Sequence, residues 1–334
     1  MIPRLDIHFN TQERRWFRQG REYTMPKGEF WLNHCRSGLV LALQTLELKP
    51  QTGVGMMVYN CHTVMNAIWQ AGCTPVFVDV TDGMTIDMED LAQKREQMQV
   101  LIVTHLFGIV NDVKEIKKRY PDLIVIEDCA HCFEHKIDGE FGVYSVGQGK
   151  FPSIGDGGVL RTIEDFRLKI EDLYDALPPY SRKQEAKLYM RLWMKAMMYS
   201  KGLYWLTMKV KEKRVSGLGV SGLGEMVPIR KMARGIANIL AHTREGYKEA
   251  MLGRVRNAQR IDNALIGENA FMAVVHTDEP AVLKADYASR GIETETHFKH
   301  CIEWAKVFGY RDGSCPNAEK LTQKLVMIPT YTKI

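Results

Sequence analysis

Short apolar runs alternate with amphipathic stretches over the first half of the chain, beginning near Ser37. The runs are rich in Val, Ile and Leu, which predicts strands that are covered on both faces. These predicted strands cover residues 54–59, 75–79, 99–105 and 123–128. Apolar residues at helical spacing predict helices at 38–47, 62–71, 87–98 and 112–119. Strands and helices in alternation indicate a mostly parallel sheet in an α/β domain.

The pattern changes near residue 163. The stretch 163–214 is helical, basic and rich in Met, Tyr and Trp, and a Gly/Ser break follows at 215–224. A long helix is predicted at 228–265, followed from residue 268 by a strand, a helix at 279–290, a strand and a last helix. We therefore expect a large domain at 1–227, and a long helix with a small C-terminal α/β domain at 228–334. The first 35 residues are expected to form an irregular lead-in.

Composition and charge narrow the class of protein. Hydrophobic residues make up 45% and charged residues 25% of the chain, as in ordinary globular proteins. The net charge of +5 gives no reason to expect nucleic acid as a partner. The sequence shows no secretory signal and no apolar run long enough to span a membrane, and its seven cysteines are scattered. We therefore expect a cytoplasmic protein with reduced thiols.

Two of the cysteines, in Cys129-Ala-His-Cys132, have the CxxC spacing of many zinc sites. No second CxxC pair and no spaced His pair would complete a set of four ligands. We therefore interpret the spacing as chance and predict no metal.

Candidate chemistry begins where a predicted strand ends, at Glu127 and Asp128. Parallel sheets bind ligands at the carboxyl ends of their strands, so a carboxylate there can face a bound group. An aspartate that caps a following helix would have the same position. Further upstream, Arg36-Ser37-Gly38 precedes a helix, whose free N–H groups favour a phosphate. A simple Ser N-cap is the alternative for this triplet.

Lys150 lies in a glycine-rich run from Gly147 to Gly158. Glycines let the backbone approach a ligand closely, and a lysine there can bind phosphate or form a Schiff base. The run is not a Walker loop, because Tyr144 and Phe151 stand where that motif needs Gly and Ser or Thr. A solvated lysine on a surface loop is the remaining alternative.

These features stand in an order that a known family shares. The motifs are Ser37-Gly-Leu-Val-Leu-Ala-Leu43, Gly72-Cys-Thr-Pro-Val-Phe-Val-Asp79, His105-Leu-Phe-Gly108, Val125-Ile-Glu-Asp-Cys-Ala-His131, Tyr144-Ser-Val-Gly-Gln-Gly-Lys150 and Gly155-Asp-Gly-Gly158. With them the chain resembles the DegT/DnrJ/EryC1/StrS aminotransferases over about residues 37–324, apart from the basic helical segment. The resemblance implies a pyridoxal 5'-phosphate (PLP) enzyme of transferase fold type I, like aspartate aminotransferase. That fold is α/β, with a mostly parallel mixed sheet flanked by helices and a smaller C-terminal α/β domain.

The resemblance assigns roles residue by residue. Lys150 is similar to the family's Schiff-base lysine, and Asp128 to the aspartate that pairs with the pyridine nitrogen. Ser145 matches a serine that contacts the phosphate, and His131 a residue near the cofactor's 3-hydroxyl. The chemistry needs these types, because the lysine amine attacks an aldehyde and later moves a proton at the substrate carbon. The aspartate keeps the ring nitrogen protonated, so that the ring accepts electrons.

Other cofactor contacts are matched less closely. The resemblance places the phosphate end of the first helix at Ser37, Gly38 and Leu39, where Leu39 replaces a usual Thr. Cys61 aligns with the aromatic residue that stacks on the cofactor ring, and His62 or Tyr59 could take that role.

The resemblance implies an aminotransferase that moves an amino group from L-glutamate, or a similar donor, to a keto sugar that is linked to a nucleotide. Such a reaction serves the biosynthesis of surface polysaccharides or amino sugars. Two alternatives are a sugar dehydratase, against which Lys150 argues because such members carry His there, and a PLP-binding regulatory protein. Leu39 and Cys61 keep the non-enzymatic alternative open. The family also implies a homodimer with shared active sites.

The segment 180–214 holds ten basic and two acidic residues, a charge of +8 that exceeds the +5 of the whole chain. Lys183, Lys187, Arg191 and Lys195 recur every four residues and so form one stripe on a helix, with many apolar residues between them. One interpretation is a helix packed on the domain with this stripe in solvent. The other is contact with an anionic surface, either a membrane leaflet or the phosphates of a substrate.

Overall fold

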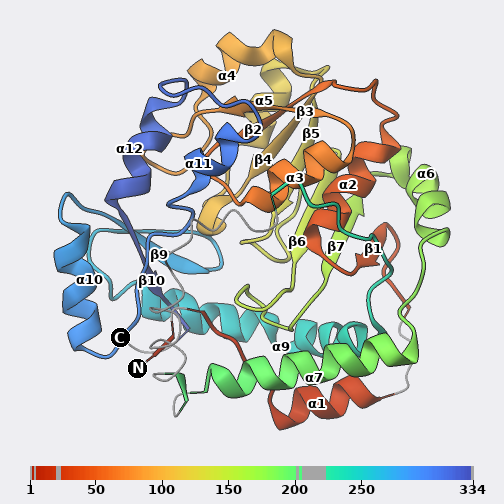
Figure 1. Cartoon of the computed structure of the whole chain (residues 1–334), viewed down its shortest axis with the longest axis vertical. Coiled ribbons are helices and arrows are strands. Elements are labelled where there is room, and N and C mark those ends of the chain that lie inside the picture. Colours follow the sequence, from red (N-terminus) through yellow and green to blue (C-terminus); the bar gives the residue numbers. More distant parts are fainter. Residues whose placement is uncertain (1, 4, 20–23, 201–202, 205–222, 332–334) are drawn as a thin grey trace.

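A seven-stranded sheet forms the centre of the molecule in the computed structural model, which describes residues 2–3, 5–19, 24–200, 203–204 and 223–331 (Figure 1). Its strands are β1 (Glu29–Leu32), β2 (Gly53–Met57), β3 (Thr74–Val78), β4 (Val100–Thr104), β5 (Ile124–Cys129), β6 (Phe141–Ser145) and β7 (Gly158–Thr162). Their order in space is β1-β7-β6-β5-β4-β2-β3. Strands β2 to β6 run parallel, whereas β7 is antiparallel to both β6 and β1. The predicted mixed, mostly parallel sheet is therefore confirmed.

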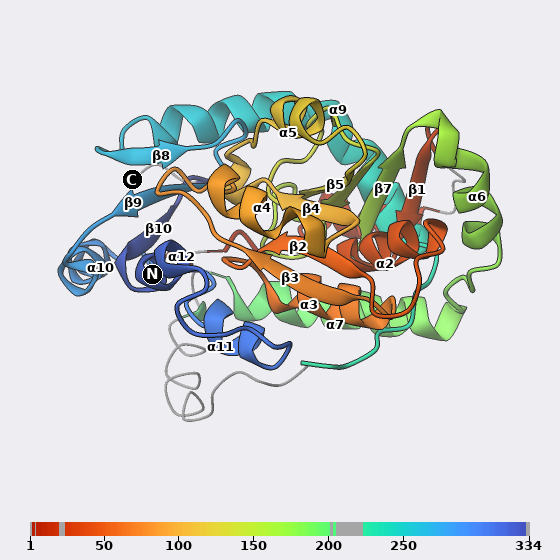
Figure 2. The ribbon, with the colours of Figure 1, turned by 90° about the horizontal axis from the view of Figure 1, so that it is seen from above.

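Helices lie on both faces of this sheet (Figure 2). They include α2 (Cys35–Thr45), α3 (His62–Gln70), α4 (Met88–Lys94), α5 (Val113–Arg119) and α6 (Glu164–Asp175), with short 3-10 helices at Arg95–Gln97 and Leu106–Gly108. The central strands β4 and β6 are buried at every position. For β4 this explains why its sequence is a continuous apolar run up to Thr104 rather than an alternating one. Helix α2 begins earlier than predicted and has His34 as its N-cap, so the Ser N-cap interpretation of Ser37 is wrong.

The first 35 residues are more regular than predicted. They contain helix α1 (Thr11–Arg18) and strand β1, which pairs with β7. A capping box starts α1, because Asn10 accepts the Glu13 N–H while the Glu13 carboxylate accepts the Asn10 N–H. The Asn-x-x-Glu spacing that allows this box is visible in the sequence.

A second, antiparallel sheet has the order β10-β9-β8. It consists of β8 (Ala264–Ile266), β9 (Met272–His276) and β10 (Leu325–Pro329), preceded by the long helix α9 (Arg234–Ala258) and interleaved with α10 (Pro280–Ser289), α11 (Cys301–Lys306) and α12 (Pro316–Lys324). The predicted element order is wrong here, because strand β10, not a helix, comes last and pairs with β9. One apolar core continues from the central sheet into α9 and β9, so the division at residues 227/228 stays a prediction.

The basic segment forms helix α7 (Arg182–Met198), on the same side of the molecule as α1 and α9 (Figure 1). Leu188 and Leu192 are buried, and Arg191 pairs with Asp156 at 2.6 Å. Four methionines of α7 are exposed: Met190, Met194, Met197 and Met198. The segment's Lys201, Lys209, Lys211, Glu212, Lys213 and Arg214, and most of the Gly/Ser break, lie outside the described residues. None of the helices in the described ranges is long and apolar enough to cross a membrane.

Candidate active site

A cavity of about 200 Å³ lies at the carboxyl ends of the parallel strands. The residues that line it are Cys35, Arg36, Leu39, Asn60, Cys61, Thr63, Val64, Thr104, Asp128, Ala130, His131, Ser145, Lys150 and Phe298. They come from α2, the start of α3, the ends of β4, β5 and β6, the glycine-rich loop and the C-terminal part. The cavity therefore has the position at which parallel sheets bind their ligands.

Lys150 reaches this cavity from the loop between β6 and β7, so the surface-loop alternative is wrong. Its Nζ lies 2.8 Å from Nε2 of His131. The loop needs its glycine at Gly155, where φ is +128° and a β-carbon would lie 2.7 Å from Cδ2 of Leu192. Helix α7 thus packs directly on the loop that presents the lysine.

Asp128 is the last but one residue of β5 and is 3% exposed. Its carboxylate accepts hydrogen bonds from the Ala130 N–H at 3.1 Å and the Thr104 hydroxyl at 3.2 Å. The Thr104 hydroxyl in turn accepts the Asn60 amide N–H at 2.7 Å. Burial raises the pKa of Asp128, against the effect of the hydrogen bonds from the Ala130 N–H and the Thr104 hydroxyl. Strand β6 follows β5 with no helix between them, so the helix-capping alternative for Asp128 is wrong.

His131 is buried beside Lys150. The Phe107 N–H donates to its Nδ1 at 3.0 Å, and the Phe271 ring stacks on it with centroids 4.5 Å apart. Burial holds the pKa of His131 well below its usual value, so the ring is neutral near pH 7.

The predicted phosphate contacts are only partly in the cavity. Ser145, at the end of β6, and Leu39, on α2, line it. Ser37 instead donates its hydroxyl to Asn33 at 2.9 Å, and Gly38 lets α2 approach β6, since a β-carbon there would lie 3.1 Å from Val143 Cγ1. Neither Ser37 nor Gly38 is among the lining residues, and their contact with a phosphate stays a prediction.

Cys61 lines the cavity as the N-cap of α3. Burial alone would raise the pKa of its thiol, but hydrogen bonds from His62 and Thr63 outweigh burial and lower it to about 7. The Thr63 hydroxyl lies 3.1 Å from the sulfur. His62 packs on Trp304 and does not line the cavity.

Tyr59, the other substitute for the stacking aromatic, donates its hydroxyl to the His297 carbonyl at 2.6 Å and does not line the cavity. Phe298 does line it and was not predicted. Asn60 and Thr104 were missed too, although Asn60 directly follows one predicted strand and Thr104 lies near the end of another, where a search of every strand end would have found them. Phe298 carries no such signal, because the C-terminal part brings it to the cavity from far away in the sequence.

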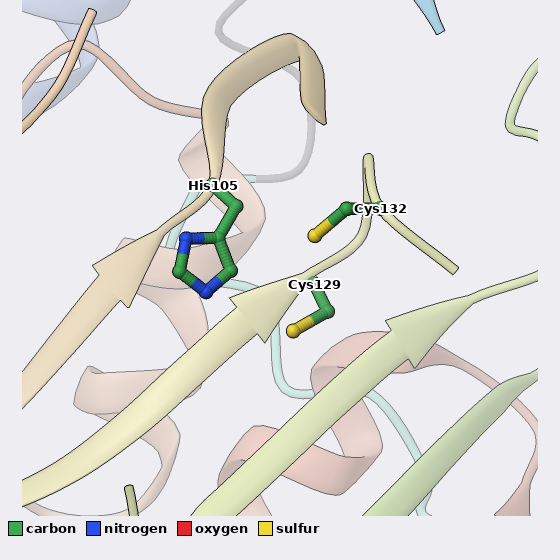
Figure 3. Close-up of side chains that lie close together, drawn as sticks. All are labelled: His105, Cys129 and Cys132. Atoms are coloured by element: carbon green, nitrogen blue, oxygen red, sulfur yellow. The ribbon is translucent and has the colours of Figure 1, made fainter. Parts of the chain in front are cut away.

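The CxxC cysteines meet a histidine that their spacing does not reveal. Figure 3 shows Cys129 and Cys132 beside His105, and the potential ligand atoms all lie within 4.8 Å of one another. Both ring nitrogens of His105 are in use, however: Nδ1 accepts the Asn111 N–H at 3.1 Å, and Nε2 lies 2.8 Å from Glu127. A metal would have to displace one of these bonds, so the group is better described as a hydrogen-bonded part of the core.

Comparison with known proteins identifies the family. A family model described as the DegT/DnrJ/EryC1/StrS aminotransferase family matches residues 18–334. The chain belongs to this family. Among its relatives, an uncharacterized protein from Methanocaldococcus jannaschii is 25% identical over 94% of this chain and 83% of its own length. A UDP-N-acetyl-3-dehydro-alpha-D-glucosamine 3-aminotransferase from Acidithiobacillus ferrooxidans is 35% identical over 39% of each chain.

Solved structures of DegT/DnrJ/EryC1/StrS proteins share the fold. The PLP form of a protein from Streptococcus pneumoniae titled as a sugar aminotransferase superposes with a TM-score of 0.72 at 18% identity, over 100% of this chain and 94% of that one. The chain is thus an aminotransferase of the PLP-dependent transferase fold, and its cofactor is PLP. The residues of the cavity fit that cofactor, because an amine, a buried carboxylate and a hydroxyl from a strand end all face one space.

Proposed function

We propose that this aminotransferase takes an amino group from L-glutamate, or a similar donor, and transfers it to a keto sugar linked to a nucleotide. The observation that carries the proposal is the meeting of Lys150, Asp128 and Ser145 in one cavity at the strand ends. The partial similarity to an aminotransferase that acts on a UDP-linked keto sugar supports the substrate class.

Each residue has a distinct task in this proposal. Lys150 would hold the cofactor covalently and later move a proton at the substrate carbon. Asp128, oriented by Thr104 and Ala130, would hold a proton on the ring nitrogen. Ser145 and the N-terminal turn of α2 would bind the phosphate, with Arg36 as a further cation at the same wall. The bound cofactor supplies an electron sink for the bond that breaks at the substrate carbon.

The test monitors two half-reactions separately through the absorbance spectrum of the cofactor. L-Glutamate should convert PLP-loaded enzyme to the aminated cofactor, and the correct nucleotide-linked keto sugar should restore the original spectrum. A matching keto sugar without its nucleotide is the control, and we expect it to react much more slowly. Failure of glutamate and of other amino acids to change the spectrum would contradict the proposal.

We also propose a homodimer with shared active sites, as the family implies, and a cytoplasmic site of action.

A second proposal concerns α7, whose exposed methionines lie on a helix that also carries Lys183, Lys187 and Lys195. Exposed apolar side chains beside basic ones are typical of a peripheral contact with an anionic membrane surface. Its test is the last prediction of the Discussion.

A further inference from the structure

The hydrogen bonds of His131 determine where its single proton lies. The Phe107 N–H points at Nδ1 from 3.0 Å, and a backbone amide can only donate. Nδ1 must therefore offer its lone pair and carry no proton. A neutral imidazole has one N–H, so the proton is on Nε2.

This proton faces the lysine. Nε2 of His131 lies 2.8 Å from Nζ of Lys150, a normal hydrogen-bond distance. An ammonium group has three donors and no acceptor, so it would meet the Nε2 proton with its own. A neutral amine has a lone pair that can accept it. We infer that His131 is a positioning residue whose Nε2 proton favours the neutral-amine form of Lys150, the form that attacks a carbonyl carbon.

The packing around His131 fixes this arrangement. Its ring is stacked on Phe271 and lies 6.0 Å from Phe298 at an angle of 9° between the planes. A flipped ring would place carbon atoms opposite the Phe107 N–H and the Lys150 amine, and both bonds would be lost. The stack and the two polar contacts therefore select one orientation.

Among the other groups near His131 and Lys150, some favour a charged lysine and others do not. Asp128, whose carboxylate favours a charged lysine, already accepts two hydrogen bonds from Thr104 and Ala130, which reduces its pull. The Cys61 thiolate, which forms as the pH rises through about 7, also favours a charged lysine, whereas the Cys35 thiol stays protonated because burial raises its pKa. The Phe271 ring lies 5.8 Å from Nζ, at the far end of the range for a cation–π contact, and the His297 ring lies edge-on to His131 with centroids 6.1 Å apart. Among these groups, only His131 is oriented by a backbone N–H so that it presents a proton to the Lys150 amine.

The direct test observes the proton on His131 in the cofactor-free full chain. The protein is labelled with ¹⁵N in its histidines, and His131→Gln identifies the His131 signals by their loss. We expect an unprotonated Nδ1 and a protonated Nε2 from pH 6 to 8. A protonated Nδ1, or a doubly protonated ring, would overturn the inference.

A second measurement follows Lys150 itself. The cofactor-free protein is labelled at pH 7 with acetic anhydride, which reacts with neutral amines, and each lysine is quantified by peptide mass spectrometry. His131→Phe keeps a stacked ring but removes the donor, and Lys150 should then react about tenfold more slowly, the effect of one hydrogen bond. His131→Gln can accept from Phe107 and donate to Lys150, and should restore the rate.

Exposed Lys27 and Lys114 are internal controls and should react equally in all three proteins. Equal Lys150 rates in wild type and His131→Phe would contradict the inference. The use of a neutral Lys150 amine rests on the proposed function, but neither measurement uses cofactor or substrate. If the glutamate half-reaction failed, the inference about His131 and Lys150 would still hold. If the proton on His131 were found elsewhere, the proposed function would still hold.

Discussion

The cavity at the strand ends and the outer face of α7 are two regions rich in polar or charged side chains that are built in opposite ways. In the cavity, Asp128 and His131 are buried, and each is held by partners from neighbouring segments. On α7, Met194 is 51% exposed and Lys187 is exposed, with no contact that fixes its ammonium among the described residues. Sheet topology thus positions the residues of the cavity, whereas the outer face of α7 presents exposed side chains. Substitutions should change chemistry in the first region and only association in the second.

The strongest challenge to this comparison is the removal of the lysine. Lys150→Ala should abolish transamination, with a loss of at least about 10³-fold, because no other amine lines the described cavity. The free energy of unfolding should change by less than about 1 kcal/mol, since the side chain is only partly buried. Borohydride reduction and peptide mapping of the wild type should place the cofactor on Lys150. Recovery of the label on another lysine would show that the cavity is assigned wrongly.

The second substitution keeps shape and removes charge. Asp128→Asn should still bind PLP, but the glutamate half-reaction should slow by about 10²–10³-fold, as when other preorganised charges are lost. The rate of this half-reaction is measured by single-turnover absorbance of the cofactor. Glu115→Gln, at an exposed position on α5, is the matched control and should leave the rate unchanged. A normal rate in Asp128→Asn would mean that the ring nitrogen lies elsewhere.

Glu127, next to Asp128 in the sequence, should affect stability rather than chemistry. Hydrogen bonds from His105 and His135 overcome the effect of burial and lower the pKa of Glu127 to about 2. A lowered carboxyl pKa stabilises the fold above the unfolded value, near 4.5, and this contribution is lost as the pH falls towards 2. Glu127→Gln should cost about 3 kcal/mol at pH 7 in urea unfolding, because it leaves a buried partner unpaired. The difference from wild type should shrink by pH 3, whereas exposed Glu249→Gln should change little at either pH.

Cys61 tests whether the cavity controls the reactivity of its thiols. With a pKa of about 7, lowered by His62 and Thr63 against burial, this thiol should react with iodoacetamide at a rate that rises to half its maximum near pH 7. Cys35, in the same cavity, should stay unreactive there because burial raises its pKa. Thr63→Val should move the Cys61 midpoint upward, and bound PLP should protect it. Equal pH profiles for Cys35 and Cys61 would argue against this electrostatic account.

The sequence predicted the cavity better than its surroundings, for physical reasons. Asp128 stands at the end of a strand that the apolar pattern predicts, and parallel strands bring their carboxyl ends together whatever the rest of the chain does. Lys150 was predicted from its glycine-rich motif and the family resemblance. Strands β6 and β7, which hold the lysine loop between them, were missed because Phe141–Ser145 and Gly158–Thr162 are short and rich in glycine and polar residues. Phe298 and the His105–Cys129 contact depend on tertiary packing, which no local pattern encodes. For α7 the helix is confirmed, but the amphipathic pattern could not say which apolar residues stay exposed.

The smallest expected effect is at the α7 face, and it decides whether this face is a binding surface. Met190, Met194, Met197 and Met198 are 43–51% exposed along the helix that also carries the basic stripe. We predict that the protein floats with vesicles containing anionic lipid at low salt, and that binding falls at high salt or with neutral lipid.

Each exposed lysine near an anionic surface contributes about 1 kcal/mol, so Lys183→Glu with Lys187→Glu should reduce vesicle binding by well over tenfold. The matched control is charge reversal at Lys114 and Lys118, which are 77% and 81% exposed on α5 and should not matter. Met194→Ser should weaken binding by a smaller factor through lost apolar contact. Transamination should be normal in all of these variants, because none of the residues lines the cavity. Binding that ignores salt and lipid charge would contradict the electrostatic account, and no binding at all would assign the face to solvent or to a second copy of the chain.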